Sequence, residues 1–94
     1  METRIGFVGI VVQRMESAPD VNRVLSLFGD MIRGRIGIPS RTEHTAVIGV
    51  IVEGDNSRIG AMTGKLGNIP GITVKSAIAP AETRKQANGI ADIG

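Results

Sequence analysis

The chain has no cysteine, tryptophan or tyrosine and only two phenylalanines among its 94 residues. The missing cysteines exclude disulfides, thiolate zinc sites, iron–sulfur ligation and a cysteine nucleophile. The scarcity of aromatic residues argues against an RNA-recognition domain, which stacks bases on aromatic side chains of its sheet. A single histidine, His44, supplies neither a catalytic triad nor a set of imidazole ligands. We therefore predict a protein that is not an enzyme and has no cofactor and no metal site.

Long apolar runs and one-sided charge are also missing. The longest apolar run, Phe7 to Val12, is too short to cross a bilayer, and no signal-peptide cleavage region follows it. The 11 basic and 9 acidic residues are interspersed along the chain and leave a formal net charge of +2. A dedicated nucleic-acid binder would concentrate its basic residues. The sequence predicts a cytoplasmic protein that contacts neither membrane nor nucleic acid directly.

Glycine is abundant, and the segment GAMTGKLGNIPG from Gly60 onward contains four of the 13 glycines. A phosphate-binding P-loop needs four residues between its glycines and a hydroxyl residue after the lysine. Here three residues separate Gly60 from Gly64, and Leu66 follows the lysine. The apolar residues of the segment recur at helical spacing, so we predict a helix that ends before Gly67, with Gly67 in a positive-φ conformation.

Reading along the chain gives six elements in the order βαββαβ. Strands are predicted where Ile, Val and Phe alternate between turn residues, and helices where apolar residues recur three and four positions apart after a capping residue. The predicted strands cover residues 4–13, 31–38, 45–53 and 72–78, and the predicted helices cover residues 17–28 and 55–66.

The alternation within the strands indicates how they are arranged. The second and fourth strands are apolar on one side, whereas the first and third are apolar on both sides, which is typical of central strands. This pattern predicts an α+β, ferredoxin-like sheet in the order 4-1-3-2, with both helices on one face. The domain is predicted over residues 1–79, and residues 80–94 are predicted to be a tail that includes a short helix over 81–87.

This arrangement leaves an aliphatic stripe on the sheet face without helices, flanked by Arg33, Arg35 and Lys75. A monomer rarely exposes such a patch, so we predict a dimer or tetramer that covers it, with the tail folding over it as the alternative. The face cannot be told from sequence. The predicted interface residues therefore come from both parities of the central strands: Val8, Ile10, Val47, Ile48 and Val50.

The segments RIGFVGIVV, RGRIGIP and GKLGNIPG together resemble the iron-only hydrogenase system regulator family. The resemblance covers nearly all of residues 2–78. It implies a stand-alone ACT-like domain, similar to the C-terminal sensing domain of nickel-responsive regulators, that assembles through its sheet. It also implies a ligand-sensing regulatory role without a DNA-binding domain of its own. The alternative is a structural adaptor that acts through protein contacts alone.

Two departures bear on the site that this resemblance implies. Nickel-responsive regulators bind their metal through several histidines and a cysteine, a set that this chain lacks. Amino-acid-binding ACT domains place a glycine where this chain has Asp20. The predicted ligand-binding residues are therefore those that could meet an anionic effector: Glu16 and Ser17 at the first helix N-terminus, with Arg33 and Arg35. Edge protection is the alternative role of the two arginines. The effector, a possible protein partner, and the choice between transcription and hydrogenase maturation stay open.

Overall fold

The computed structural model describes residues 2–40 and 44–80 of the chain. The elements follow one another in the predicted βαββαβ order, with two short 3-10 helices flanking the first α-helix. Their bounds are β1 (Arg4–Val12), η1 (Met15–Ser17), α1 (Ala18–Leu27), η2 (Gly29–Met31), β2 (Ile32–Pro39), β3 (Ala46–Gly54), α2 (Asn56–Gly67) and β4 (Ile72–Ile78). The predicted short helix over 81–87 lies outside the described residues.

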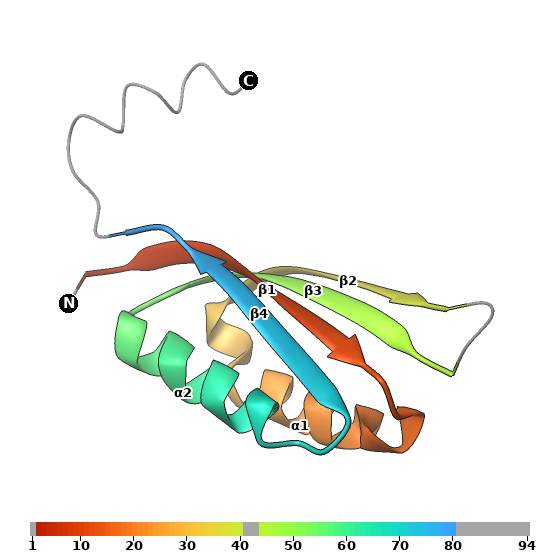
Figure 1. Ribbon diagram of the computed structural model, residues 1–94. Coiled ribbons are helices and arrows are strands. Elements are labelled where there is room, and N and C mark those ends of the chain that lie inside the picture. The colour runs from red at the N-terminus through yellow and green to blue at the C-terminus, as the bar shows by residue number, and fades with distance from the viewer. Residues whose placement is uncertain (1, 41–43, 81–94) are drawn as a thin grey trace, which may run out of the picture.

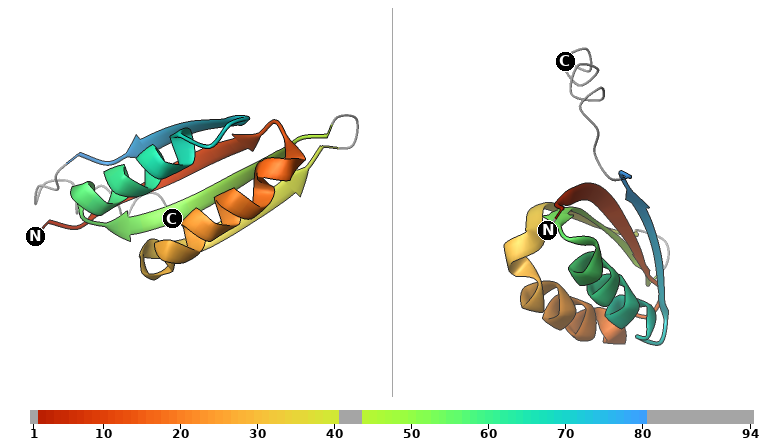
Figure 2. Two further views of the ribbon diagram at one scale, coloured as in Figure 1. Left: turned by 90° about the horizontal axis from the view of Figure 1, so that it is seen from below. Right: turned by 90° about the vertical axis from the view of Figure 1, so that its left-hand side faces the viewer.

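The four strands form one antiparallel sheet in the order β2-β3-β1-β4, which is 4-1-3-2 when read from the β4 edge. Both helices lie on the same face of the sheet, as Figure 1 shows. Figure 2 shows α2 beside β4 and β1, and α1 beneath β3 and β2. The fold is thus a small ferredoxin-like α+β fold, and one face of its sheet has no helix upon it.

The core lies between the sheet and the helices. On α1, Val21, Val24 and Leu25 share one side because residues three and four apart are neighbours on a helix. The same spacing places Ile59, Met62 and Leu66 of α2 in the core. From the sheet come Val8, Ile10, Val12, Ile48, Val50 and Val52, all nearly or fully buried. Each such side chain contributes about 1.5–3 kcal/mol when it is fully buried.

The core assignment corrects four of the five predicted interface residues. Val8, Ile10 and Val50 are fully buried and Ile48 is 8% exposed, because they face the helices. Only Val47, on the opposite parity of β3, is well exposed. The predicted two-sided character of the central strands is correct, but the interface prediction mixed both parities.

The start of β2 departs from the predicted alternation. The register with β3 shifts between Ile32 and Gly34, which is the signature of a bulge. As a result Ile32 packs against the core, whereas Ile36 and Ile38 point away from the helices and are more than half exposed. Arg35 lies on the helix side and donates to Asn22 Oδ1 of α1 at 2.6 Å. The sequence predicted that Arg35 flanks the helix-free face. This prediction is wrong, because Arg35 lies on the helix side.

The turn from α2 into β4 also differs from the prediction. Gly67 is the last residue of α2, and among the described residues only Gly71 has a positive φ, of 79°. At Gly71 an added Cβ would lie 2.8 Å from Arg14 Cγ, so glycine is required there by both conformation and space. Gln13 N donates to Gly71 O at 2.8 Å, which fixes this turn against the end of β1.

Candidate functional site

The helix-free side of the sheet, called the open face below, carries most of the exposed apolar side chains of the described residues. Its strands expose seven large aliphatic or aromatic side chains to between 37 and 61%. The strand register places them in adjacent rows: Ile5, Phe7 and Val11 on β1, Val47 and Ile51 on β3, and Ile36 and Ile38 on β2. The open face is therefore a continuous apolar surface across three strands.

Two glycines shape the centre of the open face. Gly9 of β1 pairs directly with Gly49 of β3, so the middle row has no side chain at two neighbouring positions. The ring of Phe7 lies over this gap, since a Cβ added to Gly49 would lie 2.7 Å from Phe7 Cζ. A Cβ on Gly9 would lie 3.4 Å from Phe7 Cε2. The result is a flat surface on which one ring covers bare backbone.

Charged and polar groups lie at the margins of this surface. Lys75 of β4 pairs with Gly9, which places it on the open face at the β4 edge. Glu53 of β3 pairs with Ile5 and accepts from Arg33 Nε at 3.1 Å. An apolar centre with a polar rim is the composition of many protein–protein interfaces.

The glycines of the central strands did not mark the open face in the sequence. Gly9 and Gly49 share their parity with the apolar residues of the open face, but Gly6 of β1 pairs with the buried Val52 on the parity that fills the core. The prediction missed Phe7 and Ile51 because both parities of the central strands are apolar. It missed Ile36 and Ile38 because the bulge reverses the parity of β2.

The structure does not bring the predicted ligand-binding residues together. Ser17 is 7% exposed, and its Oγ donates to Pro70 O at 2.7 Å, so its hydroxyl joins the β1–α1 and α2–β4 connections. Ser17 makes no side-chain cap of α1, and its neighbour Glu16 is exposed. Both follow the end of β1, whereas Arg33 lies beside the opposite end, next to the Ile32–Val52 pair.

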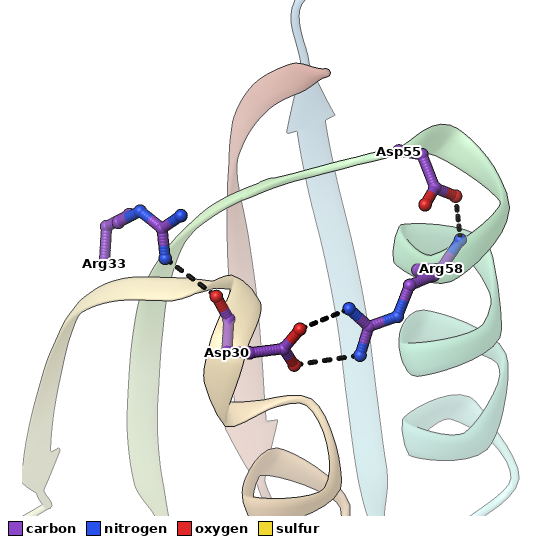
Figure 3. A network of polar contacts seen from close by, with 4 residues as sticks. All are labelled: Asp30, Arg33, Asp55 and Arg58. Atoms are coloured by element: carbon purple, nitrogen blue, oxygen red, sulfur yellow. Dashed lines mark hydrogen bonds and ion pairs between the residues drawn. The ribbon is translucent and has the colours of Figure 1, made fainter. Parts of the chain in front are cut away.

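A polar network joins the end of α1 to the start of α2 (Figure 3). Arg58 of α2 donates from both terminal nitrogens to the carboxylate of Asp30 in η2, at 2.5 and 2.9 Å. The same guanidinium lies 5.6 Å from the centre of the Phe28 ring, a cation–π contact. Asp55 caps α2 by accepting from Arg58 N at 2.9 Å, and Arg33 donates to Asp30 O at 2.8 Å. This network fixes the two helices to each other.

The network makes one contribution to stability dependent on pH. The hydrogen bonds from Arg58 lower the pKa of Asp30 below its ordinary value of 3.8, and the charge of Arg58 adds to this effect. A carboxyl whose pKa is lowered by folding stabilises the protein above its ordinary pKa, and this contribution is lost as the pH falls through the lowered value. The effect is small because the pair is exposed to solvent.

We expect Asp30→Asn to reduce the loss of stability that the protein shows as the pH becomes acidic. As the pH falls from about 5 to about 2, the thermal midpoint of the parent should fall more steeply than that of the variant. Asp20→Asn is the control, because Asp20 pairs with Arg23 within α1 and joins no second element. Parallel acid limbs for the parent and Asp30→Asn would contradict the assignment.

Metal ligands do not gather among residues 2–40 and 44–80, where no group of three His, Asp or Glu side chains could hold an ion. His44 is exposed and precedes β3. One imidazole with scattered carboxylates makes a poor site for nickel. We expect calorimetry to show no submicromolar nickel binding, and stoichiometric binding abolished by His44→Ala would contradict this prediction.

A shallow hollow lies beside the N-terminus of α2. It is lined by Glu2, Arg4, Asp55, Asn56 and Ser57. Asp55 already caps the helix there, and the hollow combines two carboxylates with one guanidinium. This mixture has no clear preference for an anion or a cation, and the hollow adds no catalytic set.

Comparison with known proteins gives a family and a fold. The TM1266-like family model, described as "Iron-only hydrogenase system regulator, putative", matches residues 4–76. The structure of uncharacterized protein TM1266 from Thermotoga maritima is 39% identical, with a TM-score of 0.79, covering 84% of this chain and all of that one. A search of curated proteins gave no match.

More distant structures share the fold alone. The C-terminal domain of the MgtC protein from Mycobacterium tuberculosis is 12% identical, with a TM-score of 0.67, covering 88% of this chain and 96% of that one. A formyltetrahydrofolate deformylase from Pseudomonas putida is 13% identical, with a TM-score of 0.58, and the match covers 81% of this chain and 29% of the enzyme. No helix in the described part of the chain is long and apolar enough to span a membrane.

Proposed function

Because the chain belongs to the iron-only hydrogenase system regulator family, we propose that it is a small regulatory module that acts by binding and not by catalysis. We further propose that it works as an oligomer in which the open faces of two copies pack against each other. The observation that carries this proposal is the continuous apolar surface of the open face. Its position opposite the helices is also the arrangement expected of an ACT-like sensing domain.

The size of the open face supports a second copy as its occupant. The exposed parts of its seven side chains amount to roughly 600 Å², the upper end of the patches found on monomers and close to the ~800 Å² per partner of a standard interface. Two sheets pack face to face about 10 Å apart when their side chains interdigitate. The ring of Phe7 covers the glycine row at Gly9 and Gly49, so the centre of the open face is flat enough for a second sheet to lie against it.

Ligand sensing is the second part of the proposal and depends on assembly. Within one copy two of the predicted ligand-binding side chains form structural contacts, Ser17 with Pro70 and Arg35 with Asn22. We therefore place the effector site where two copies meet. If no ligand binds, the protein is instead an adaptor that acts through protein contacts alone. Native mass spectrometry of the purified protein separates these two cases by the presence of a bound small molecule.

The assembly is tested with two matched substitutions. The substitutions are Ile36→Glu on the open face and Leu27→Glu on α1. Ile36 is 61% exposed and Leu27 is 62% exposed, so each variant places a carboxylate at an equally exposed apolar site. Ile36→Glu should halve the mass measured by light scattering, whereas Leu27→Glu should keep the mass of the parent. A monomeric parent at micromolar concentration would overturn the proposal and favour the tail as the cover of the open face.

A further inference from the structure

The two edges of the sheet differ in how they are protected. The β2 edge carries a bulge between Ile32 and Gly34 and ends at Pro39, and both features hinder the addition of another strand. The β4 edge pairs with β1 over seven residues without a bulge or a proline. A regular edge without a bulge or a proline is a template for strand pairing, and Lys75 is the one charged side chain on β4.

The outward backbone groups of β4 can be identified from its bonds to β1. Gln13 N donates to Gly71 O, and Ala79 N donates to Ile5 O, at the two ends of the pairing. Hydrogen-bonded pairs alternate along an antiparallel ladder, so the odd-numbered residues of β4 bond to β1. The even-numbered residues direct their N–H and C=O groups outward: Ile72, Val74, Ser76 and Ile78.

We propose that β4 pairs antiparallel with β4 of a second copy, so that two sheets join into one of eight strands. This inference rests on the proposed oligomer but concerns a different surface, the β4 edge and not the open face. Lys75 restricts the register, because a pairing centred on it would set two like charges opposite each other. A register centred on Val74 places each Lys75 opposite Thr73 of the second copy, and a register centred on Ser76 places it opposite Ala77. In both registers the outward N–H and C=O groups of the two β4 strands can pair with each other.

The helix α2, which lies next to β4, leaves room for this contact between two β4 edges. Arg58 reaches Asp30 beyond the end of α1, so its side of α2 faces α1 (Figure 3). Gly60 and Gly67 follow Arg58 by two and nine residues, which places them about half a turn away, on the side opposite α1. Figure 2 shows that α2 lies next to β4. An added Cβ at Gly60 or Gly67 would meet nothing within 4 Å, so this glycine flank is open.

The size of the contact fits a partial interface within a larger assembly. Seven strand residues span about 23 Å, and the sheet and helix layers together are about 20 Å deep, which gives roughly 900 Å² counted over both copies. This area lies just below the roughly 1,000 Å² of the smallest stable interfaces. Joining the β4 edges also places two open faces side by side on one sheet, so the edge contact and the face contact reinforce each other.

The test places a bulky polar side chain on the glycine flank. For the double variant Gly60→Gln, Gly67→Gln, the added Cβ atoms meet no atom of their own copy within 4 Å, and glutamine is a better helix former than glycine. We expect four copies in the parent by light scattering, two in this variant, and one when Ile36→Glu is added. Gly29→Gln is the control, because Gly29 is equally open but lies in η2, away from the β4 edge.

A second variant removes the backbone donor directly. Ser76→Pro deletes an outward N–H and leaves the bonds to β1 intact, so it should also halve the mass while circular dichroism stays unchanged. A parent mass that persists in both edge variants would overturn the edge pairing. A mass halved by the edge variants but unchanged by Ile36→Glu would instead overturn the face contact and leave the edge pairing in place.

Discussion

Ile48→Arg is expected to abolish the cooperative fold, whereas Val47→Arg one residue earlier is expected to keep it. Ile48 is 8% exposed and faces the helices, and Val47 is 53% exposed on the open face. Successive strand residues point to opposite sides of a sheet, so these two changes place the same charge in two different environments. The pair therefore tests the assignment of the two faces.

The cost at Ile48 follows from its surroundings. The substitution removes a buried side chain that contributes about 1.5–3 kcal/mol and places a guanidinium in an apolar core, where the described residues around it offer no carboxylate. The total is a large fraction of the roughly 5–15 kcal/mol by which small domains are stable. Circular dichroism with thermal melting should show no cooperative transition for this variant.

At Val47 the cost falls on assembly and not on folding. The long arginine stem extends from an exposed site, so the secondary structure and the thermal transition of the single copy should persist. The mass by light scattering should fall, because the charge would be buried between two open faces. A folded Ile48→Arg variant would mean that the helices do not cover the parity of Ile48, and the face assignment would then be wrong.

Most of the fold was predictable because the pattern of single residues determines it. Val21, Val24 and Leu25 recur at helical spacing, and Asp55 precedes α2 as a cap that accepts from Arg58 N. The strand order followed from two-sided apolar character in β1 and β3. These features are local, and local patterns are read directly from sequence.

The site was less predictable because it depends on which parity faces the helices. Both parities of β3 are apolar, so hydrophobicity could not separate Val50 from Ile51. The bulge after Ile32 reverses the parity of β2, and nothing in its alternation marks the position. Ser17 was predicted to bind a ligand at the first helix N-terminus, but the long-range contact with Pro70, 53 residues away, uses its hydroxyl. Such contacts arise only from the tertiary structure.

Gly6→Ala is expected to destabilise the protein by loosening β4 from β1. Gly6 pairs with Ile78, and a Cβ added to it would lie 2.7 Å from Ala77 O and 2.9 Å from Ile78 Cα. Both contacts are with backbone, which moves only if the β1–β4 pairing opens. Overpacking of this kind costs about 1–3 kcal/mol, and the strain should be concentrated at the C-terminal end of β4.

Gly37→Ala is the matched control for this effect. Gly37 is also a strand glycine, but the nearest atom to an added Cβ is Ile48 Cγ1 at 3.9 Å, an ordinary contact. Denaturant unfolding should show a lower free energy of unfolding for Gly6→Ala, and for Gly37→Ala a free energy of unfolding within about 0.5 kcal/mol of the parent value. Amide exchange should be faster near Ile78 in Gly6→Ala alone. Because β4 is also the proposed pairing edge, the mass of the Gly6→Ala assembly should fall together with its stability. Equal stability of the two variants would contradict the close packing of β4 on Gly6.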